Sequence, residues 1–252
     1  MSESAFTPKD DLPDTSGFVL PDAAKLEAMA EFAAGAGHEI NNPLATIIGR
    51  AQLLLKDEQD PQRRQMLLAI GAQAYRIRDM IGDAMLFGRP PAPELRDVDL
   101  TCTMSDILSK QAADIANDRC TVNVEIPNGL LVKADSTQLA IVLSELLRNS
   151  RQALQLIGGG EIRVRAALRD AFAFIEIEDR GQGFSEIERQ HAFDPFYSGR
   201  QAGRGLGFGL SKCWRIVRQH RGRIEIESTS AGPTIVRVIW PLGVTQDASE
   251  QS

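Results

Sequence analysis

Small and apolar residues recur at alternating steps of three and four positions in the first third of the sequence, and this spacing constrains the fold more than any other feature. After residue 22 they fall at Ala30, Ala33, Gly37, Ile40, Leu44, Ile47, Ala51 and Leu54. The polar segment 56–61 interrupts the series, which resumes at Leu67, Ile70, Ala74, Ile77, Ile81 and Ala84. Such spacing forms the apolar seam of a coiled coil or helix bundle. Two such helices joined by a short polar turn predict an antiparallel hairpin.

One hairpin alone leaves much apolar surface in water. Two hairpins paired into a four-helix bundle bury both seams, so the pattern predicts a homodimer. Pro90, Pro91 and Pro93 cannot continue the second helix and indicate a semi-stiff linker. The expected boundaries are a flexible N-terminal tail at 1–21, the dimerisation hairpin at 22–88, the linker at 89–97, a second domain at 98–243 and a flexible C-terminal tail at 244–252.

Helical and strand patterns are interleaved in the second domain. Asp135 is placed to cap a helix that runs to about Leu156, whereas residues 184–204 show little periodicity. The other expected elements are helices at 101–117 and 206–220 and strands at 121–126, 162–168, 172–178, 223–228 and 234–240. After the four-helix bundle we therefore predict an α+β sandwich, in which helices cover one face of a mixed sheet.

Composition narrows the function classes. A net charge of −6 and a pI of about 5.2 leave no basic excess for binding nucleic acid. The three cysteines fit neither a metal site nor a disulfide framework, which indicates a reducing cytoplasm. The first 21 residues have the pattern of neither a signal peptide nor a membrane anchor, and the sequence lacks a run of about 18 apolar residues that would predict a membrane span.

The segment around His38 is the first candidate site. His38 follows the seam residue Gly37, so we expect it on the flank of the bundle, within reach of solvent and of another domain. Glu39 could accept a proton from the imidazole and leave the other ring nitrogen free to attack phosphorus. Asn42 lies one turn further along on the same face. Pro43 should bend the helix at a cost of about 3 kcal/mol, a local violation expected mainly at functional sites.

The plainer alternative for His38 is a partly exposed histidine in a polar patch. His191 and His220 lack the setting of His38. His191 lies in the irregular segment, and His220 ends a helix, where a cation suits the helix dipole. We interpret both as structural.

Two polar clusters in the second domain are suited to a nucleotide. Glu145 and Asn149 share one helical face with Gln152 beside them, and could hold Mg²⁺ or a polarised water near phosphates. Asp179 ends an apolar strand and could accept a hydrogen bond from the exocyclic amine of a base. The Gly181–Gly183 turn that follows lets the backbone approach a planar ring. Taken singly, the clusters equally fit an exposed polar helix face and a glycine turn.

A glycine-rich run opens the helix expected at 206–220. Its members are Gly203, Gly205, Leu206, Gly207 and Gly209. Glycines before a helix N-terminus expose N–H groups where the helix dipole favours phosphate. The run is neither a Walker loop nor a dinucleotide motif, because it lacks a Gly-Lys-Ser/Thr sequence and a preceding strand. The preceding segment, Phe193–Arg200, could act as a lid with Arg200 directed at phosphate.

Taken in order, these five segments resemble the H, N, G1, F and G2 boxes of the two-component histidine kinases, and the resemblance covers about residues 22–241. It implies a dimerisation and phosphoacceptor hairpin followed by an ATP-binding catalytic domain. It also implies autophosphorylation of His38 with ATP and Mg²⁺, and phosphotransfer to an aspartate on the receiver domain of a response regulator. Dephosphorylation of that regulator is a further implied activity.

The resemblance assigns roles residue by residue. His38 is implied as the phosphoacceptor, Glu39 as its proton acceptor and Asn42 as the residue that orients water during dephosphorylation. Asn149 is implied as a Mg²⁺ ligand, together with Glu145, which is also a candidate catalytic residue. The implied nucleotide contacts are Asp179 at the adenine amine, Arg200 at a phosphate, and Asn149, Gln152, Phe193, Gly181, Gly183, Gly203, Gly205, Leu206, Gly207 and Gly209 around the pocket.

Two residues depart from the family pattern. Glu145 stands where asparagine is usual and resembles the wider ATPase superfamily, in which glutamate activates water. Gln152 replaces a lysine found in many members, and either Arg148 or Arg151 could compensate for the missing positive charge.

Two other classes of function stay open. One is a serine kinase or an ATP-driven switch on the same ATPase fold, against which the heptad hairpin with His38 weighs. The other is a non-catalytic scaffold that docks a regulator without binding ATP. The presence of Asn149 and Asp179 weighs against that scaffold.

Overall fold

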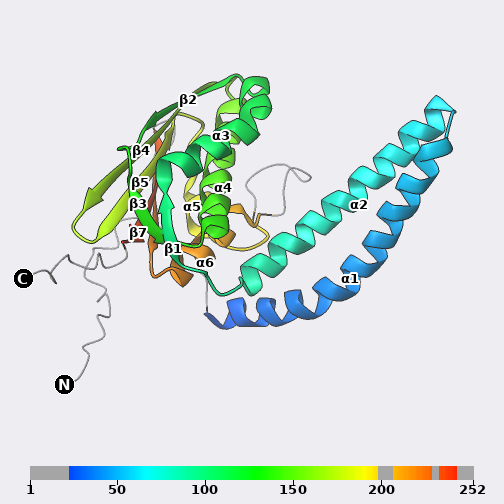
Figure 1. Cartoon of the computed structure of the whole chain (residues 1–252), viewed down its shortest axis with the longest axis horizontal. Coiled ribbons are helices and arrows are strands. Elements are labelled where there is room, and N and C mark those ends of the chain that lie inside the picture. Colours follow the sequence, from blue (N-terminus) through cyan, green and yellow to red (C-terminus); the bar gives the residue numbers. More distant parts are fainter. Residues whose placement is uncertain (1–22, 198–206, 229–232, 243–252) are drawn as a thin grey trace, which may run out of the picture.

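The structure of the chain, a computed structural model, describes residues 23–197, 207–228 and 233–242. Helices α1 (Ala23–Asp57) and α2 (Pro61–Gly88) form a long antiparallel hairpin (Figure 1). Asp60 fixes the start of α2, because its carboxylate accepts a 2.9 Å hydrogen bond from the backbone N–H of Arg63. Pro61 then occupies the first turn, where its missing N–H removes no helical hydrogen bond. The predicted hairpin is confirmed.

The heptad seam is divided between two surfaces of the hairpin. Leu44, Ala51 and Ala74 are buried in the monomer, with Ile48 packed beside them. The remaining surface carries an apolar stripe of seam residues that are each at least 41% exposed: Ile47, Leu54, Ile70 and Ile77. Exposed apolar surface of this kind is typical of an interaction face. Within the described ranges, none of the helices is both long and apolar enough to cross a membrane.

Beyond the hairpin lies an α+β sandwich with a five-stranded sheet of order β2-β4-β5-β7-β6. Strands β2 and β4 are parallel and the other neighbours are antiparallel. The strands are β2 (Cys120–Glu125), β4 (Gly160–Arg169), β5 (Phe172–Asp179), β6 (Arg223–Ser228) and β7 (Thr234–Pro241). Helices α3 (Leu100–Asn117), α4 (Ser136–Gln155) and α6 (Gly209–Gln219) cover one face (Figure 1). The predicted mixed sheet covered on one face is confirmed.

Alternation along the strands explains why the helices lie on one face only. In β5, Ala173, Ile175 and Ile177 are fully buried beneath the helices. Glu176 points to the opposite face, where it accepts a 2.7 Å hydrogen bond from Arg237 of β7. A strand with period-two patterning of this kind buries one face and leaves the other polar.

Two short strands were not predicted. Strands β1 (Arg96–Asp99) and β3 (Leu131–Ala134) pair with each other in a separate two-stranded sheet. Each has four residues, too few for a clear alternation, and their pairing is long-range. Strand β1 begins inside the segment 89–97 that was expected to be linker.

The helix boundaries near the glycine run also differ from expectation. Helix α5 (Glu186–His191) lies in the segment expected to be irregular, and Ser185 and Glu188 form a capping box at its start. That signal was present in the sequence but was overlooked. Helix α6 begins at Gly209 and not at residue 206.

His220 is structural, as predicted, but the cationic form proposed for it is wrong. Its Nε2 accepts a hydrogen bond from the backbone N–H of Asp135 at 3.2 Å, and its Nδ1 donates to the carbonyl oxygen of Ile216 at 2.9 Å. One acceptor and one donor nitrogen define the neutral imidazole. The ring is buried against Trp240, and this burial lowers the pKa of His220.

Candidate nucleotide site

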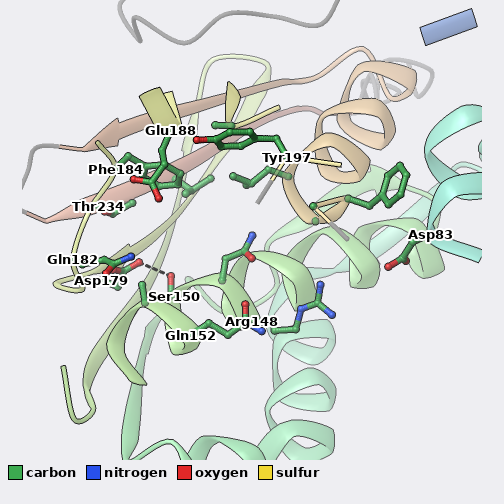
Figure 2. A pocket seen from close by; sticks show the side chains of 18 of the residues that line it. Asp83, Arg148, Ser150, Gln152, Asp179, Gln182, Phe184, Glu188, Tyr197 and Thr234 are labelled. Atoms are coloured by element: carbon green, nitrogen blue, oxygen red, sulfur yellow. Dashed lines mark hydrogen bonds between the residues drawn. The ribbon is translucent and has the colours of Figure 1, made fainter. Parts of the chain in front are cut away.

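A cavity of about 720 Å³ lies where α4, the turn after β5, α5 and the start of α6 face helix α2 (Figure 2). Asp179 and Thr234 stand at one end and Asp83 at the other, with Arg148 nearer to Asp83. The described residues therefore place this cavity between the α+β domain and the helical hairpin. Its volume is in the range of pockets that hold small molecules.

Helix α4 supplies one wall of the cavity. Another face of the helix packs Leu143, Leu147 and Leu154 into the core, and Asn149 and Gln152 line the cavity. The cap at Asp135 fixes where this helix begins, because its carboxylate accepts from the backbone N–H of Gln138 at 3.0 Å.

Asn149 carries an unmet polar group at this wall. Its Nδ2 is buried and has no hydrogen-bond partner among the described residues. A buried amide group without a partner is costly, so the site suits a polar ligand. Apart from masked residues, no cluster of three or more histidine, cysteine, aspartate or glutamate side chains could hold a metal alone. An amide oxygen at Asn149 and phosphate oxygens of a nucleotide are nevertheless hard ligands of the kind that Mg²⁺ takes.

Asp179 forms the floor of one end and is only 3% exposed. Its Oδ2 accepts from the Ser150 hydroxyl at 2.7 Å, and its Oδ1 accepts from the Gly181 backbone N–H at 2.9 Å. Burial raises the pKa of this carboxyl, while the two donors act in the opposite direction. Each oxygen keeps a further lone pair for a donor such as an exocyclic amine.

Close packing requires glycine at two of the candidate positions that the structure describes, Gly181 and Gly207. A Cβ at Gly181 would lie 2.6 Å from the Cβ of Ala153, and one at Gly207 would lie 2.1 Å from the carbonyl oxygen of Tyr197. Gly207 also has a φ of +74°, in the left-handed region that favours glycine. Gly183, with a φ of +71°, and Gly209 line the cavity.

The start of α6 differs from the starts of α2, α3, α4 and α5, which an aspartate or serine side chain caps. Phe208 stands at the cap position of α6, and no side chain of the described residues forms a cap hydrogen bond there. Gly209 and Leu210, in its first turn, line the cavity. Open N–H groups at a helix N-terminus form an anion site.

Glu145 is placed differently from the expected metal ligand and catalytic residue. It is not among the described residues that line the cavity. Its Oε1 lies 3.2 Å from Nζ of Lys212, and its Oε2 pairs with Arg148. Both oxygens therefore already face cations, an arrangement that opposes direct metal binding and water activation by this carboxylate.

Lys212 is the partner of Glu145 that sequence reasoning missed. It is 4% exposed and also contacts Asp83 of α2 at 2.5 Å. Burial disfavours its charged form, but Glu145 and Asp83 outweigh burial and raise the pKa of Lys212. No local signal identifies this contact, because its partners are 129 and 67 positions away.

The two arginines proposed to replace the missing lysine have different positions. Arg151 is turned away from the cavity towards α3, where it donates to Asp118 at 2.9 Å and to Gln111 at 2.8 Å. Arg148 lines the cavity. The structure therefore favours Arg148 as the compensating cation.

The remaining candidate residues of the second domain fall into two groups. Phe193 is buried in the core and is not among the described lining residues. Arg200, Gly203, Gly205 and Leu206 lie outside the described residues. Gln182 and Tyr197, which line the cavity, belong to the predicted glycine turn and lid segment. Sequence reasoning missed other lining residues: Tyr75, Arg76, Asp79 and Asp83 from α2, and Phe184, Glu188 and Thr234 from the second domain.

On the hairpin, His38 lies within α1, but its side chain is outside the described part of the structure. Glu39 and Asn42 are exposed. Gly37 packs against α2 so closely that a Cβ there would lie 2.3 Å from the sulfur of Met85. The backbone of His38 therefore stands at the level of Met85, two residues from Asp83 at the end of the cavity.

Two family descriptions match separate parts of the chain. Residues 28–93 match the His Kinase A (phospho-acceptor) domain, and residues 134–244 match the histidine kinase-, DNA gyrase B- and HSP90-like ATPases. The fold and site thus define an ATPase-type nucleotide-binding domain that follows a phosphoacceptor hairpin.

The chain is similar to a curated kinase and to two solved structures. Sporulation kinase C of Bacillus subtilis is 27% identical over 93% of this chain and 54% of its own length. Full-length ShkA in complex with AMPPNP has a TM-score of 0.75 at 18% identity, covering 85% of this chain and 46% of that one. Histidine kinase ThkA in complex with the response regulator protein TrrA has a TM-score of 0.60 at 22% identity, covering 87% of this chain and 64% of that one.

The chain belongs to the two-component histidine kinases, and the resemblance stated from the five sequence segments is confirmed. It spans about half of the length of the curated relatives that it matches.

Proposed function

We propose that the chain transfers the γ-phosphoryl group of ATP to His38 and then to an aspartate on a response regulator. One observation carries the proposal. One end of the cavity has the buried carboxylate of Asp179, which could accept a hydrogen bond from a nucleobase, and the other end reaches Asp83, near the level of His38 on the hairpin. A nucleotide bound along this cavity would direct its phosphates towards the phosphoacceptor helix.

Each end of the cavity suits one part of ATP. Asp179 would accept from the adenine amine, and Phe184 and Tyr197 supply aromatic surface near that end (Figure 2). The open start of α6 and the Arg148 guanidinium would receive the phosphates. Mg²⁺, held by the Asn149 amide oxygen and the phosphates, would neutralise charge that develops during transfer.

In the transfer step a ring nitrogen of His38 attacks the γ-phosphorus, an N–P bond forms, and the bond to the β–γ bridging oxygen breaks as ADP leaves. Glu39 would accept the proton from the other ring nitrogen. The protein then mainly positions the reactants. The linker at 89–97, which joins the proposed domains at 22–88 and 98–243, would let the ATP domain reach the histidine.

The partners are proposed on the same basis. The apolar stripe of Ile47, Leu54, Ile70 and Ile77 supports a homodimeric four-helix bundle. The structural likeness to ThkA, solved in complex with the response regulator protein TrrA, supports a response regulator as the partner. We place its receiver domain on the hairpin, where its aspartate would reach His38. Asn42 is exposed one turn after His38, where it could orient water for dephosphorylation of the regulator.

The test is incubation of the purified chain with γ-labelled ATP and Mg²⁺. We expect acid-labile label on the wild-type chain, none on His38→Gln, and transfer of the label to a receiver domain from the same genome. Acid-stable label, or acid-labile label that survives in His38→Gln, would contradict the proposal. Lack of ATP binding in calorimetry would indicate a scaffold.

A further inference from the structure

Four charged side chains meet at the end of the cavity nearest His38, where Asp83 and Arg148 line the wall and Glu145 and Lys212 lie behind it. Lys212 lies 2.5 Å from Asp83 and 3.2 Å from Glu145, and Glu145 pairs in turn with Arg148. We call these four residues the charge cluster. It contains two acidic and two basic groups and is electrically neutral as it stands.

The members of the charge cluster come from different parts of the fold. Glu145 and Arg148 belong to α4 and Lys212 to α6, whereas Asp83 belongs to α2 of the hairpin. If α2 separates from the second domain, Asp83 leaves with it. Lys212, Arg148 and Glu145 then remain with a net charge of +1.

The contact that holds Asp83 in place is mainly apolar. Phe87, one turn after Asp83, is 1% exposed, and its ring centroid lies 5.8 Å from that of Phe208. Phe208 directly precedes the open start of α6. The Lys212–Asp83 pair is thus a charged contact beside an apolar one, close to the part of the cavity suited to phosphate.

Asp83 is poorly placed for a site that binds a triphosphate. Its side chain is 35% exposed and lines the cavity, so an anion bound there would meet a like charge. Like charges at short range repel, and the repulsion grows as water is excluded. The same carboxylate also neutralises Lys212, a buried cation just behind the described lining of the cavity, whose positive charge would otherwise attract a phosphate bound nearby.

We propose that Asp83 is an internal counter-ion of the nucleotide site, which competes with the phosphates of ATP for the positive charge of Lys212 and Arg148. Binding of ATP and docking of α2 on the second domain therefore oppose each other. Because coupling between two binding events is reciprocal, ATP loosens the docked hairpin by the factor by which docking weakens ATP binding. This inference rests on the proposed function, in that the cavity is taken to bind ATP.

The first experiment measures binding of AMPPNP and of adenosine to the whole chain by calorimetry. We expect Asp83→Asn to bind AMPPNP about fivefold or more tightly than wild type, a typical size for such coupling. Lys212→Met should bind AMPPNP more weakly by a similar factor. Adenosine has no phosphates, so its affinity should stay within about twofold in both variants. Asp57→Asn, which makes the same change in net charge at the end of α1, is the matched control and should behave as wild type.

The outcomes separate the two proposals. A wild-type chain that binds neither AMPPNP nor adenosine overturns the proposed function. If the wild-type chain binds AMPPNP and Asp83→Asn binds it equally or more weakly, the proposal that Asp83 is a counter-ion is wrong. Weaker binding would instead make Asp83 a ligand for the cation that accompanies the nucleotide.

A second experiment needs no variant. Hydrogen exchange of the backbone N–H groups at 80–88 in α2 should accelerate when AMPPNP is added to the wild-type chain, and adenosine should have no such effect. Unchanged or slower exchange with AMPPNP would show that docking and phosphate binding do not compete.

Discussion

The Ser150 hydroxyl donates a 2.7 Å hydrogen bond to Oδ2 of Asp179 and so ties helix α4 to the end of strand β5 beneath the cavity. With the Gly181 N–H at 2.9 Å, it holds the carboxylate in one orientation. The proposed adenine contact therefore depends on a side chain that would not touch the nucleotide. Such supporting hydrogen bonds keep a binding group in its working geometry.

Replacement of Asp179 by asparagine should weaken ATP binding. The amide presents an N–H₂ group towards one of the two present donors and weakens the acceptor offered to the adenine amine. Hydrogen bonds to charged groups contribute about 1.5–3 kcal/mol, so we expect a loss of affinity of that order, measured by calorimetry. The control is Asp170→Asn, in the exposed turn between β4 and β5, where asparagine tolerates the φ of 53°. Equal affinities for ATP in both variants would show that Asp179 does not contact the nucleotide.

Replacement of Glu145 by glutamine should lower the stability of the fold without removing the Mg²⁺ dependence of nucleotide binding. The change leaves Lys212 and Arg148 without their shared carboxylate, and breaking a buried pair costs about 3–5 kcal/mol at most, less here because Arg148 is 44% exposed. The free energy of unfolding in urea should therefore fall, while binding of ATP keeps its dependence on Mg²⁺. If a folded Glu145→Gln chain binds ATP without dependence on Mg²⁺, Glu145 is a metal ligand after all.

Alanine should be tolerated very differently at two glycines. Gly207→Ala places a methyl group against Tyr197 at a positive φ, and strained conformations of this kind cost about 1–3 kcal/mol each. Gly49→Ala lies in α1 with no atom within 4 Å of the added Cβ, and alanine is favoured over glycine in a helix by about 1 kcal/mol. Urea unfolding should show a loss of stability for the first and a gain for the second. A stable Gly207→Ala chain with normal ATP affinity would refute the packing argument.

Stability should depend on pH through His220. Burial lowers the folded-state pKa of His220 below its value of 6.5 in the unfolded chain, so below pH 6.5 the unfolded chain binds more protons. The stabilisation is complete above pH 6.5 and is lost as pH falls from there towards the folded-state pKa. One such group changes the free energy of unfolding by at most about 1.4 kcal/mol per pH unit.

The measurement is urea unfolding between pH 7.5 and 5.5. We expect a decline in wild type that is smaller in His220→Gln, whatever the stability of that variant at pH 7.5. His191→Gln serves as the second histidine replacement and should retain the decline. An identical slope in wild type and His220→Gln would mean that the buried ring does not titrate as argued.

The elements that sequence reasoning identified are those with local signals. The Asp135 cap, the heptad spacing through Leu44 and Ala74, and the alternation from Ala173 to Ile177 each depend on residues a few positions apart. Strands β1 and β3 have no such signal because their stability comes from pairing 36 positions apart at Asp97 and Lys133.

The same distinction holds within the cavity. Asn149, Gln152, Asp179, Gly183, Gly207 and Gly209 were expected on motif grounds and line it or its floor. The roles of Ser150, Lys212 and Asp83 depend on which helices meet across the fold, and motif spacing carries no information on that meeting. Glu145 shows the limit most clearly, because the motif identified the residue but gave no information on Lys212 and Arg148, the cations that pair with it.

The exposed apolar stripe on the hairpin has a consequence for any measurement made in dilute solution. If two stripes cover each other, folding of the hairpin is linked to association by mass action. The midpoint of thermal unfolding for α1 and α2 then rises with protein concentration, while that of the α+β sandwich, whose core is complete in one chain, does not. On dilution, the unfolding midpoint of the helical hairpin would therefore fall while that of the α+β sandwich stayed constant.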